Sequence, residues 1–188
     1  MKKIKILFLI SLAFVISTLS SCDNKQADIK KIMHGFKWHQ SMDDIKKLDL
    51  ANLKCTSAPE GWACSSWSSP YGIKDSYYYF FVVLRDKGLA SLLILELKNQ
   101  NNQQTLLNNY NKLNQSLFNI FGPPSYQIDN IPRDNTFFQC LENKECGEIK
   151  SQYDTNNVTT ILNIIGDNNG GRLSLLMAID NNDNINYY

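Results

Sequence analysis

The sequence contains few of the residues and motifs on which enzymes rely. Only two histidines, His34 and His39, occur in 188 residues, and a separation of five does not place two ligands on one helical face. The sequence has no H-E-x-x-H motif, no G-x-S-x-G motif and no P-loop, which are typical of zinc proteases, serine hydrolases and nucleotide-binding enzymes. We therefore predict a protein without catalytic activity, metal or cofactor, in which both histidines are ordinary polar residues.

Acidic motifs for catalysis or calcium binding are lacking as well. Asp43 and Asp44 are adjacent, so their side chains diverge on a helix, where capping and the helix dipole explain them. The segment GDNNGG (residues 166–171) alternates acidic and amide side chains, but no glutamate follows that could close an EF-hand loop. We interpret this segment as a hairpin turn.

Neither sign of charge is in large excess. Lysine and arginine together number 19 and aspartate and glutamate 18, which gives a net charge of +1. Residues 1–21 contain three of the lysines, so without them 19 − 3 = 16 basic residues face 18 acidic ones, a net charge of −2. Nucleic-acid binding requires a basic footprint, and we predict no nucleic-acid partner.

No apolar run reaches the roughly 20 residues that a helix needs to cross a bilayer core. The longest, LFLISLAFVISTL (residues 7–19), has 13 residues and follows Lys2, Lys3 and Lys5. A short cationic start, an apolar run of this length and small residues after it are typical of a secretory signal peptide. We predict that residues 1–21 form this signal peptide.

The end of that run, LSSC (residues 19–22), resembles the lipobox of bacterial lipoproteins. The resemblance implies cleavage before Cys22, attachment of diacylglycerol to its sulfur and acylation of the new amino group. Each buried lipid methylene contributes about 0.8 kcal/mol, so these chains would hold the protein on the periplasmic side of a bacterial membrane. Asp23 and Asn24 resemble the signal that retains lipoproteins in the inner membrane. The alternative is an ordinary secretory signal cut near Ser21.

Cysteine is sparse after the anchor, and its spacing does not suit zinc. The remaining four are Cys55, Cys64, Cys140 and Cys146, with no C-x2-C pair and no histidine nearby. An even number of cysteines in an exported domain indicates disulfides, for which three pairings are possible. Proximity in the sequence favours Cys55–Cys64 and Cys140–Cys146, each contributing about 2–4 kcal/mol.

The strongest secondary-structure signals are a hairpin and a helix. Residues 77–84 and 89–97 are aromatic, aliphatic or β-branched on both faces, and a turn at Asp86-Lys87-Gly88 joins them. This pattern predicts central strands that are covered, at least in part, on both sides. Residues 103–122 carry an apolar stripe at helical spacing and end at Gly122, followed by two prolines. The stripe consists of Leu106, Tyr110, Leu113, Leu117 and Phe121.

Weaker signals complete the fold. Phe36 and Trp38 alternate like a strand, and Ser41 begins a helix with Asp44 as the partner in a capping box. Residues 55–70 read as a loop or an irregular hairpin. Four further strands are predicted in residues 136–142, 147–155, 157–165 and 172–180. The expected fold is α+β, with a largely antiparallel sheet, two main helices packed on one face and disulfides that staple it.

The chain divides into four parts on these grounds. Residues 1–21 are the signal peptide, residues 22–33 the lipidated cysteine with a tether or weak helix, residues 34–180 one domain and residues 181–188 a frayed tail. The order of motifs between residues 35 and 124 (GFKWHQSMDDIKKL, an aromatic hairpin, then a helix ending FGPP) resembles a layout seen in small bacterial envelope proteins. That resemblance implies no particular function.

Aromatic side chains between two of the cysteines suggest a binding surface. Trp62, Trp67 and Tyr71 lie in or beside the predicted disulfide-linked loop, and such residues often dominate protein interfaces. The alternative is that these rings have a structural role and pack back over the sheet. We predict a membrane-anchored periplasmic protein-binding module, in its narrower form an inhibitor or immunity protein against a toxin. The second hypothesis is an accessory lipoprotein of an envelope assembly or secretion machine.

Overall fold

The computed structural model describes residues 26–143, 145–155, 157–167 and 170–179. The predicted signal peptide, Cys22, the Asp23-Asn24 pair and the predicted tail, residues 181–188, lie outside the described residues.

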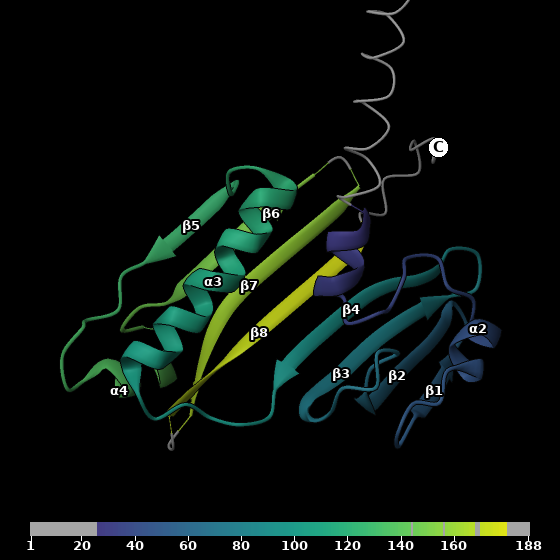
Figure 1. Ribbon diagram of the computed structural model, residues 1–188, viewed down its shortest axis with the longest axis horizontal. Helices are drawn as coiled ribbons and strands as arrows, with labels where there is room; N and C mark the ends of the chain where they lie inside the picture. Colours follow the sequence, from purple (N-terminus) through teal and green to yellow (C-terminus); the bar gives the residue numbers. More distant parts are fainter. Residues whose placement is uncertain (1–25, 144, 156, 168–169, 180–188) are drawn as a thin grey trace, which may run out of the picture.

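An antiparallel sheet of eight strands forms the centre of the molecule (Figure 1). Its spatial order is β1-β2-β3-β4-β8-β7-β6-β5, and every neighbouring pair is antiparallel. The strands are β1 (Lys54–Ala58), β2 (Gly61–Ser68), β3 (Lys74–Leu84), β4 (Gly88–Glu96), β5 (Tyr126–Asp129), β6 (Ile149–Asp154), β7 (Val158–Asp167) and β8 (Gly170–Ile179). The α+β class and the antiparallel sheet predicted from the sequence are confirmed.

From each edge of the sheet, successive strands follow chain order toward the centre. Strands β1 to β4 form one meander and β5 to β8 a second, and the two meanders meet where β4 pairs with β8. Each meander follows helical segments in the chain: residues 26–32 and α2 (Met42–Lys47) precede the first, and α3 (Gln103–Phe121) precedes the second. The sheet is therefore built from two halves that share one central junction.

The predicted start of one helix at Ser41 and the predicted end of the other at Gly122 are confirmed. Ser41 and Asp44 form the capping box at the start of α2, with backbone and side chain bonded reciprocally. Asn102 caps α3 by accepting a hydrogen bond from the Thr105 amide. Gly122 ends α3 at a φ of 86°, a backbone angle that favours glycine.

Helix α3 lies over β6, β7 and β8 and is joined to them by polar contacts as well as apolar ones (Figure 1). The hydroxyls of Tyr110 and Ser151 share a buried hydrogen bond of 2.7 Å. The Tyr153 hydroxyl donates to the Asn114 carbonyl oxygen at 3.0 Å. Four residues of the helix are buried, namely Leu106, Tyr110, Leu117 and Ile120, as the apolar stripe predicts for the first three.

Two predicted strands are wrong. Phe36 and Trp38 lie in a turn rather than a strand, because His34 and Gly35 take positive φ angles of 52° and 95° and fold Phe36 into the core at 0% exposure. Residues 137–142, predicted as a strand, form the short helix α4 (Phe137–Glu142). Phe137, Cys140 and Leu141 are buried there at helical spacing.

Other parts of the fold depart from the sequence prediction more mildly. Residues 55–70, predicted as a loop or an irregular hairpin, contain most of a regular hairpin that β1 and β2 form. Strand β5 was not predicted. Residues 26–32 are helical, and Ile29, Ile32 and Met33 pack on the core, so this segment is part of the folded unit. The described residues thus hold four helical segments instead of the two main helices expected.

Both disulfides favoured by sequence proximity are present. Cys55 and Cys64 are directly opposite each other in the β1–β2 ladder, with their Cα atoms 4.1 Å apart. Cys140 in α4 bonds to Cys146 in the loop before β6, with Cα atoms 5.0 Å apart. The first bridge fastens the fully exposed edge strand β1 to the sheet, and the second fastens α4.

Candidate protein-binding face of the sheet

The two faces of the sheet differ sharply in burial. On β3, Tyr79, Phe81 and Val83 each have 0% exposure and belong to the core. Their neighbours Tyr78 and Phe80 point to the opposite face, because side chains alternate along a strand, and Phe80 is 40% exposed. We call the face that carries Phe80 the outer face.

A row of apolar side chains crosses the centre of the outer face. Phe80 of β3 is opposite Leu93 of β4, and Leu93 is opposite Leu176 of β8. Leu176 is in turn opposite Ile161 of β7. Phe80 is 40% exposed, and the other three are partly exposed. We call these four residues, Phe80, Leu93, Leu176 and Ile161, the central row.

Apolar side chains flank the central row on both sides in the registers of the same strands. These are Tyr78 and Leu95 on one side, where Ser174 follows Leu95 in the register, and Val82 and Ala178 on the other, where Ser91 lies between them. Polar side chains replace them toward β6, where Lys150 and Gln152 are opposite Asn163 and Ile161. An apolar centre with a polar rim is the usual anatomy of a protein–protein interface.

Of the three aromatic residues predicted to contact a partner, Trp67 lies on the outer face. Its ring is 41% exposed and meets the ring of Tyr78 edge-on at 5.3 Å. Tyr78 borders the central row, so Trp67 extends the apolar surface toward β2. A bulge between Ser66 and Ser68 interrupts the ladder at this point.

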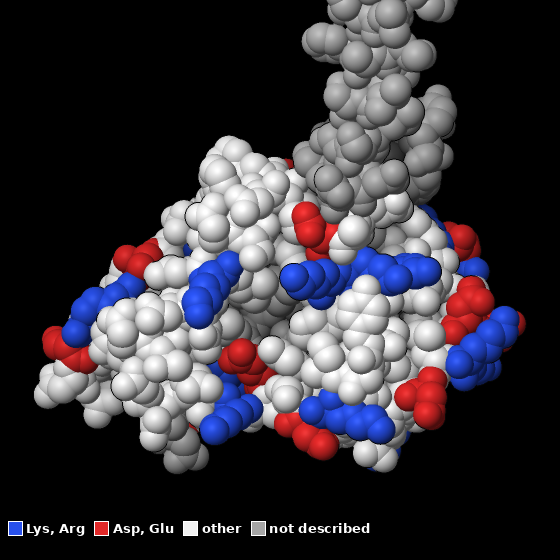
Figure 2. All heavy atoms as spheres, viewed as in Figure 1, with Lys and Arg blue, Asp and Glu red and all other residues white. Residues whose placement is uncertain are grey.

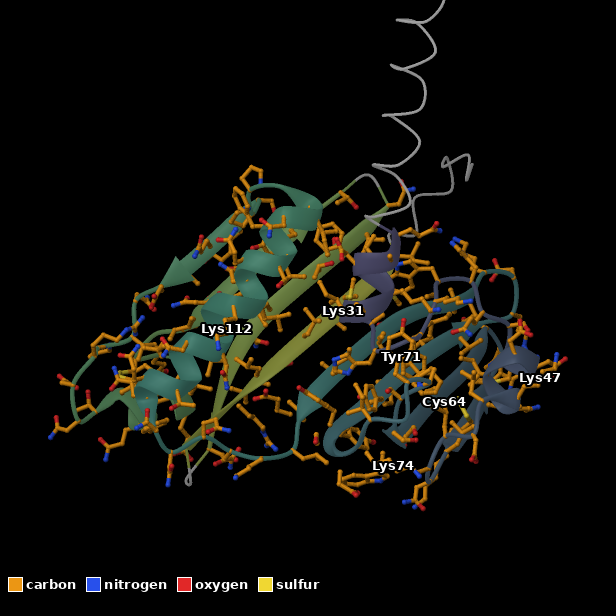
Figure 3. All side chains as sticks on the ribbon, viewed as in Figure 1. Lys31, Lys47, Cys64, Tyr71, Lys74 and Lys112 are labelled. Carbon is orange, nitrogen blue, oxygen red and sulfur yellow. A yellow bond between two sulfur atoms is a disulfide. The ribbon has the colours of Figure 1, made fainter. Side chains whose placement is uncertain are left out.

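Trp62 and Tyr71 lie on the other side of the sheet. Trp62 is opposite the buried Val83, and the guanidinium of Arg85 lies 4.5 Å from the centre of its ring. Tyr71 is 50% exposed and lies on the side of the sheet that carries the helical residues 26–32 (Figure 3), which we call the first helix. Its amide donates to the His34 carbonyl there. The structure therefore does not bring the three predicted contact residues into one patch, and their binding role stays a prediction.

Sequence reasoning missed the four residues of the central row as binding candidates. Their signal was present as the apolar character of both faces of residues 77–84 and 89–97. That pattern predicted cover on both sides of the hairpin. In the structure one face is buried in the core and the other carries the exposed Phe80.

Both histidines make contacts within the fold. Nδ1 of His34 lies 2.8 Å from the Tyr79 hydroxyl, and its ring meets that of Tyr77 edge-on. Burial lowers the pKa of His34, which favours the neutral imidazole. Burial also raises the pKa of Tyr79 to about 12. His39 lies near the turn after β3, where Nδ1 is 2.9 Å from the Lys87 carbonyl.

A cleft of about 410 Å³ opens between the first helix and α3. Ile94 and Leu175 belong to its lining, together with His34, Tyr77 and Glu96. Burial raises the pKa of the Glu96 carboxyl, which accepts a hydrogen bond from the Leu173 amide. Within the described ranges, no group of three or more potential ligands is arranged to hold a metal ion.

Comparisons with protein-family models, with curated proteins and with solved structures found no match. Among the helices of the described residues, none has the length and apolarity that crossing a bilayer would require.

Proposed function

We propose that this protein is a lipid-anchored, non-catalytic binding module on the periplasmic side of a bacterial membrane, and that the outer face of its sheet binds a folded protein. The observation that carries the proposal is the central row, Phe80, Leu93, Leu176 and Ile161, which is partly exposed in the middle of the sheet. Soluble monomers seldom present contiguous apolar surface of this kind without an interaction that uses it.

The dimensions of the outer face suit a protein partner. Eight strands at about 4.8 Å spacing span about 34 Å, and six residues along β3 cover about 20 Å. This area is close to the roughly 800 Å² that one protein contributes to a standard interface. A broad sheet surface fits a convex partner surface better than a small molecule, which binds in concave pockets. We therefore expect a folded protein with an exposed apolar patch and a polar rim.

The lipid anchor is a separate part of the proposal and rests on the LSSC motif (residues 19–22). Changing Cys22→Ala should release the protein from membranes after a salt wash. A Cys22→Ala chain that stays in the membrane fraction would refute the anchor and would leave the binding proposal unaffected.

The narrower proposal is an inhibitor or immunity protein against an enzyme that reaches the periplasm. It predicts one tight, stoichiometric partner whose activity falls on binding. An accessory role in an envelope machine predicts several resident envelope proteins instead.

The test compares wild-type protein with two matched variants in a pull-down from periplasmic and membrane extracts of its own organism. Phe80→Asp places a charge on the central row, and Phe118→Asp places the same charge on α3, where Phe118 is 45% exposed. We expect wild type and Phe118→Asp to retain the same stoichiometric protein and Phe80→Asp to lose it.

Two outcomes would overturn the proposal. Equal retention by Phe80→Asp would place binding elsewhere. A dimer of the wild-type chain in sedimentation, dissociated by Phe80→Asp, would mean that the outer face binds a second copy of this protein.

A further inference from the structure

A groove of about 670 Å³ lies beside the first helix, at the end of the molecule where the described chain begins. Met33, Phe36 and Ile179 belong to its lining and are each at most 7% exposed. Ile29 and Trp38 also line it and remain partly exposed. The volume is typical of sites for small ligands, and the apolar side chains would accept a hydrocarbon chain.

The charged lining of this groove is entirely basic. Lys30 and Lys37 contribute to it, and no aspartate or glutamate is among the described residues that line it. The ammonium of Lys30 lies 5.6 Å from the centre of the Tyr71 ring. Figure 2 shows basic side chains, with an acidic one beside them, on the surface over the first helix. An apolar groove with a cationic rim is complementary to an anionic amphiphile.

The position of the groove ties it to the proposed anchor. Gln26 lines the groove, and four residue steps separate it from Cys22. An extended chain spans at most about 14 Å over four residues. With lipid on Cys22, the bilayer surface would therefore lie within about 14 Å of the groove, and its headgroups would be the most abundant amphiphiles there.

We propose that this groove binds one anionic phospholipid of the bilayer. The first carbons of an acyl chain lie against Ile29 and Val158, two partly exposed apolar side chains of the lining, and the phosphate lies between Lys30 and Lys37. Trp38 takes the interfacial position that tryptophan favours in membranes, and lysine stems extend toward headgroups in the same way. This proposal rests on the anchor of the proposed function for the nearness of the bilayer.

Lipid binding at this groove would also orient the molecule. Val158 and Ile179 line the groove and are opposite each other in the β7–β8 ladder. They lie two positions from the buried pair Thr160 and Met177, so they are on the same, buried side of these strands. The central row lies on the opposite side of the same strands. A protein held to the membrane by the groove would keep the outer face free for its partner.

The test uses the mature chain in vesicles of phosphatidylcholine with or without phosphatidylglycerol, with bromine on the chains of one lipid or the other. Brominated phosphatidylglycerol should quench tryptophan fluorescence more than brominated phosphatidylcholine at equal bromine content. Trp38→Phe should remove that difference. Lys30→Gln with Lys37→Gln should reduce the docked population by up to about thirtyfold, at about 1 kcal/mol for each lysine near an anionic surface. Lys37→Gln alone should give a smaller loss in the same direction.

The control is Lys46→Gln with Lys47→Gln, which removes the same charge from α2; Lys47 is labelled there in Figure 3, away from the first helix. This variant should behave as wild type. Equal quenching by both brominated lipids, or an equal loss in the α2 variant, would overturn the proposal. Mass spectrometry of the N-terminal peptide reads the lipid on Cys22 separately. If that lipid is absent, the proposed anchor is refuted. Binding of the soluble chain to the same vesicles then still tests whether the groove binds an anionic phospholipid.

Discussion

Leu93 of β4 and Leu176 of β8 are directly opposite each other at the junction of the two halves of the sheet. Phe80 lies next to Leu93 in the first half, and Ile161 lies next to Leu176 in the second. Each half thus supplies two of the four residues of the central row, from its last strand and the strand before it. The apolar centre of the outer face exists only when both halves are joined, so neither meander alone would form the proposed binding surface.

Variants of Trp67 and Trp62 would distinguish two possible binding surfaces, because the two rings lie on opposite sides of β2. We expect Trp67→Ala to weaken partner binding at least tenfold, as loss of an interface tryptophan commonly does. Its melting temperature should fall only slightly, since the Trp67 ring is 41% exposed. Trp62→Ala should lower stability more and affinity less, because Trp62 packs on the core. Titration calorimetry and thermal unfolding of both variants provide the measurement.

The opposite pattern would support only the Trp62 and Tyr71 part of the sequence prediction and would contradict the Trp67 part. If Trp62→Ala and Tyr71→Ala weaken binding and Trp67→Ala does not, the partner contacts the side of the sheet that carries the first helix. A large stability loss in Trp67→Ala with unchanged affinity would assign that ring to structural packing alone.

The elements that sequence reasoning predicted correctly are those with a long, uninterrupted pattern. Helix α3 carries its stripe over about five turns between a cap and Gly122. Strand β3 is aromatic or aliphatic over eight residues, and β4 is apolar from Leu89 to Leu95 apart from Ser91. The predictions for short segments were wrong because a few residues fit both the period of two of a strand and the period of 3.6 of a helix. Phe137, Phe138 and Leu141 suit both a strand and a single helical turn, and packing on β7 selects the helix.

The candidate site was harder to predict than the fold for a different physical reason. An apolar side chain that faces the core and one that faces a partner have the same chemistry, so Phe80 and Phe81 look alike in the sequence. The fold separates them, with Phe81 at 0% exposure and Phe80 at 40%. Pairing of β4 with β8 joins residues about 80 positions apart, and no local pattern indicates that the central row extends across this junction.

Thr160 offers a simple route to a more stable protein. It has 0% exposure on β7, and its hydroxyl has no hydrogen-bond partner among the described residues. Thr160→Val keeps the shape and removes the unsatisfied group, so the free energy of unfolding should rise by about 1 kcal/mol. Urea unfolding measures the change. The control is Thr159→Val, which removes a hydroxyl that donates to Asp154 at 2.8 Å and should give no gain. An unchanged or lower stability in Thr160→Val would contradict the prediction.

The Cys55–Cys64 disulfide should matter most for the edge of the sheet. All five residues of β1 are exposed, and among the described strands β1 pairs only with β2. Replacing both cysteines by alanine should cost about 2–3 kcal/mol, the usual effect of opening a loop of this size. Hydrogen exchange should show faster exchange in β1 than in wild type. Replacing Cys140 and Cys146 instead should leave β1 protected, and equal loss of β1 protection in both variants would contradict a local role.

Alkaline pH should destabilise the fold through two buried tyrosines. Burial raises the pKa of Tyr79 and of Tyr110 to about 12, against about 10 in an unfolded chain. The unfolded state therefore loses these protons first, so the stability that each contributes is complete below pH 10 and is lost as the pH rises toward 12. Urea midpoints measured from pH 8 to pH 12 should fall across that window.

Two variants of one hydrogen bond assign the alkaline effect to Tyr110. Tyr110→Phe and Ser151→Ala each break the buried 2.7 Å bond. Each change should lower the free energy of unfolding by about 1–3 kcal/mol at neutral pH, because the remaining buried hydroxyl loses its partner. Only Tyr110→Phe removes the titrating phenol, so its urea midpoint should decline less between pH 10 and pH 12 than that of Ser151→Ala. Parallel declines in the two variants would mean that Tyr110 does not contribute to the alkaline loss, which would then rest on Tyr79 and the hydrogen bond it shares with His34.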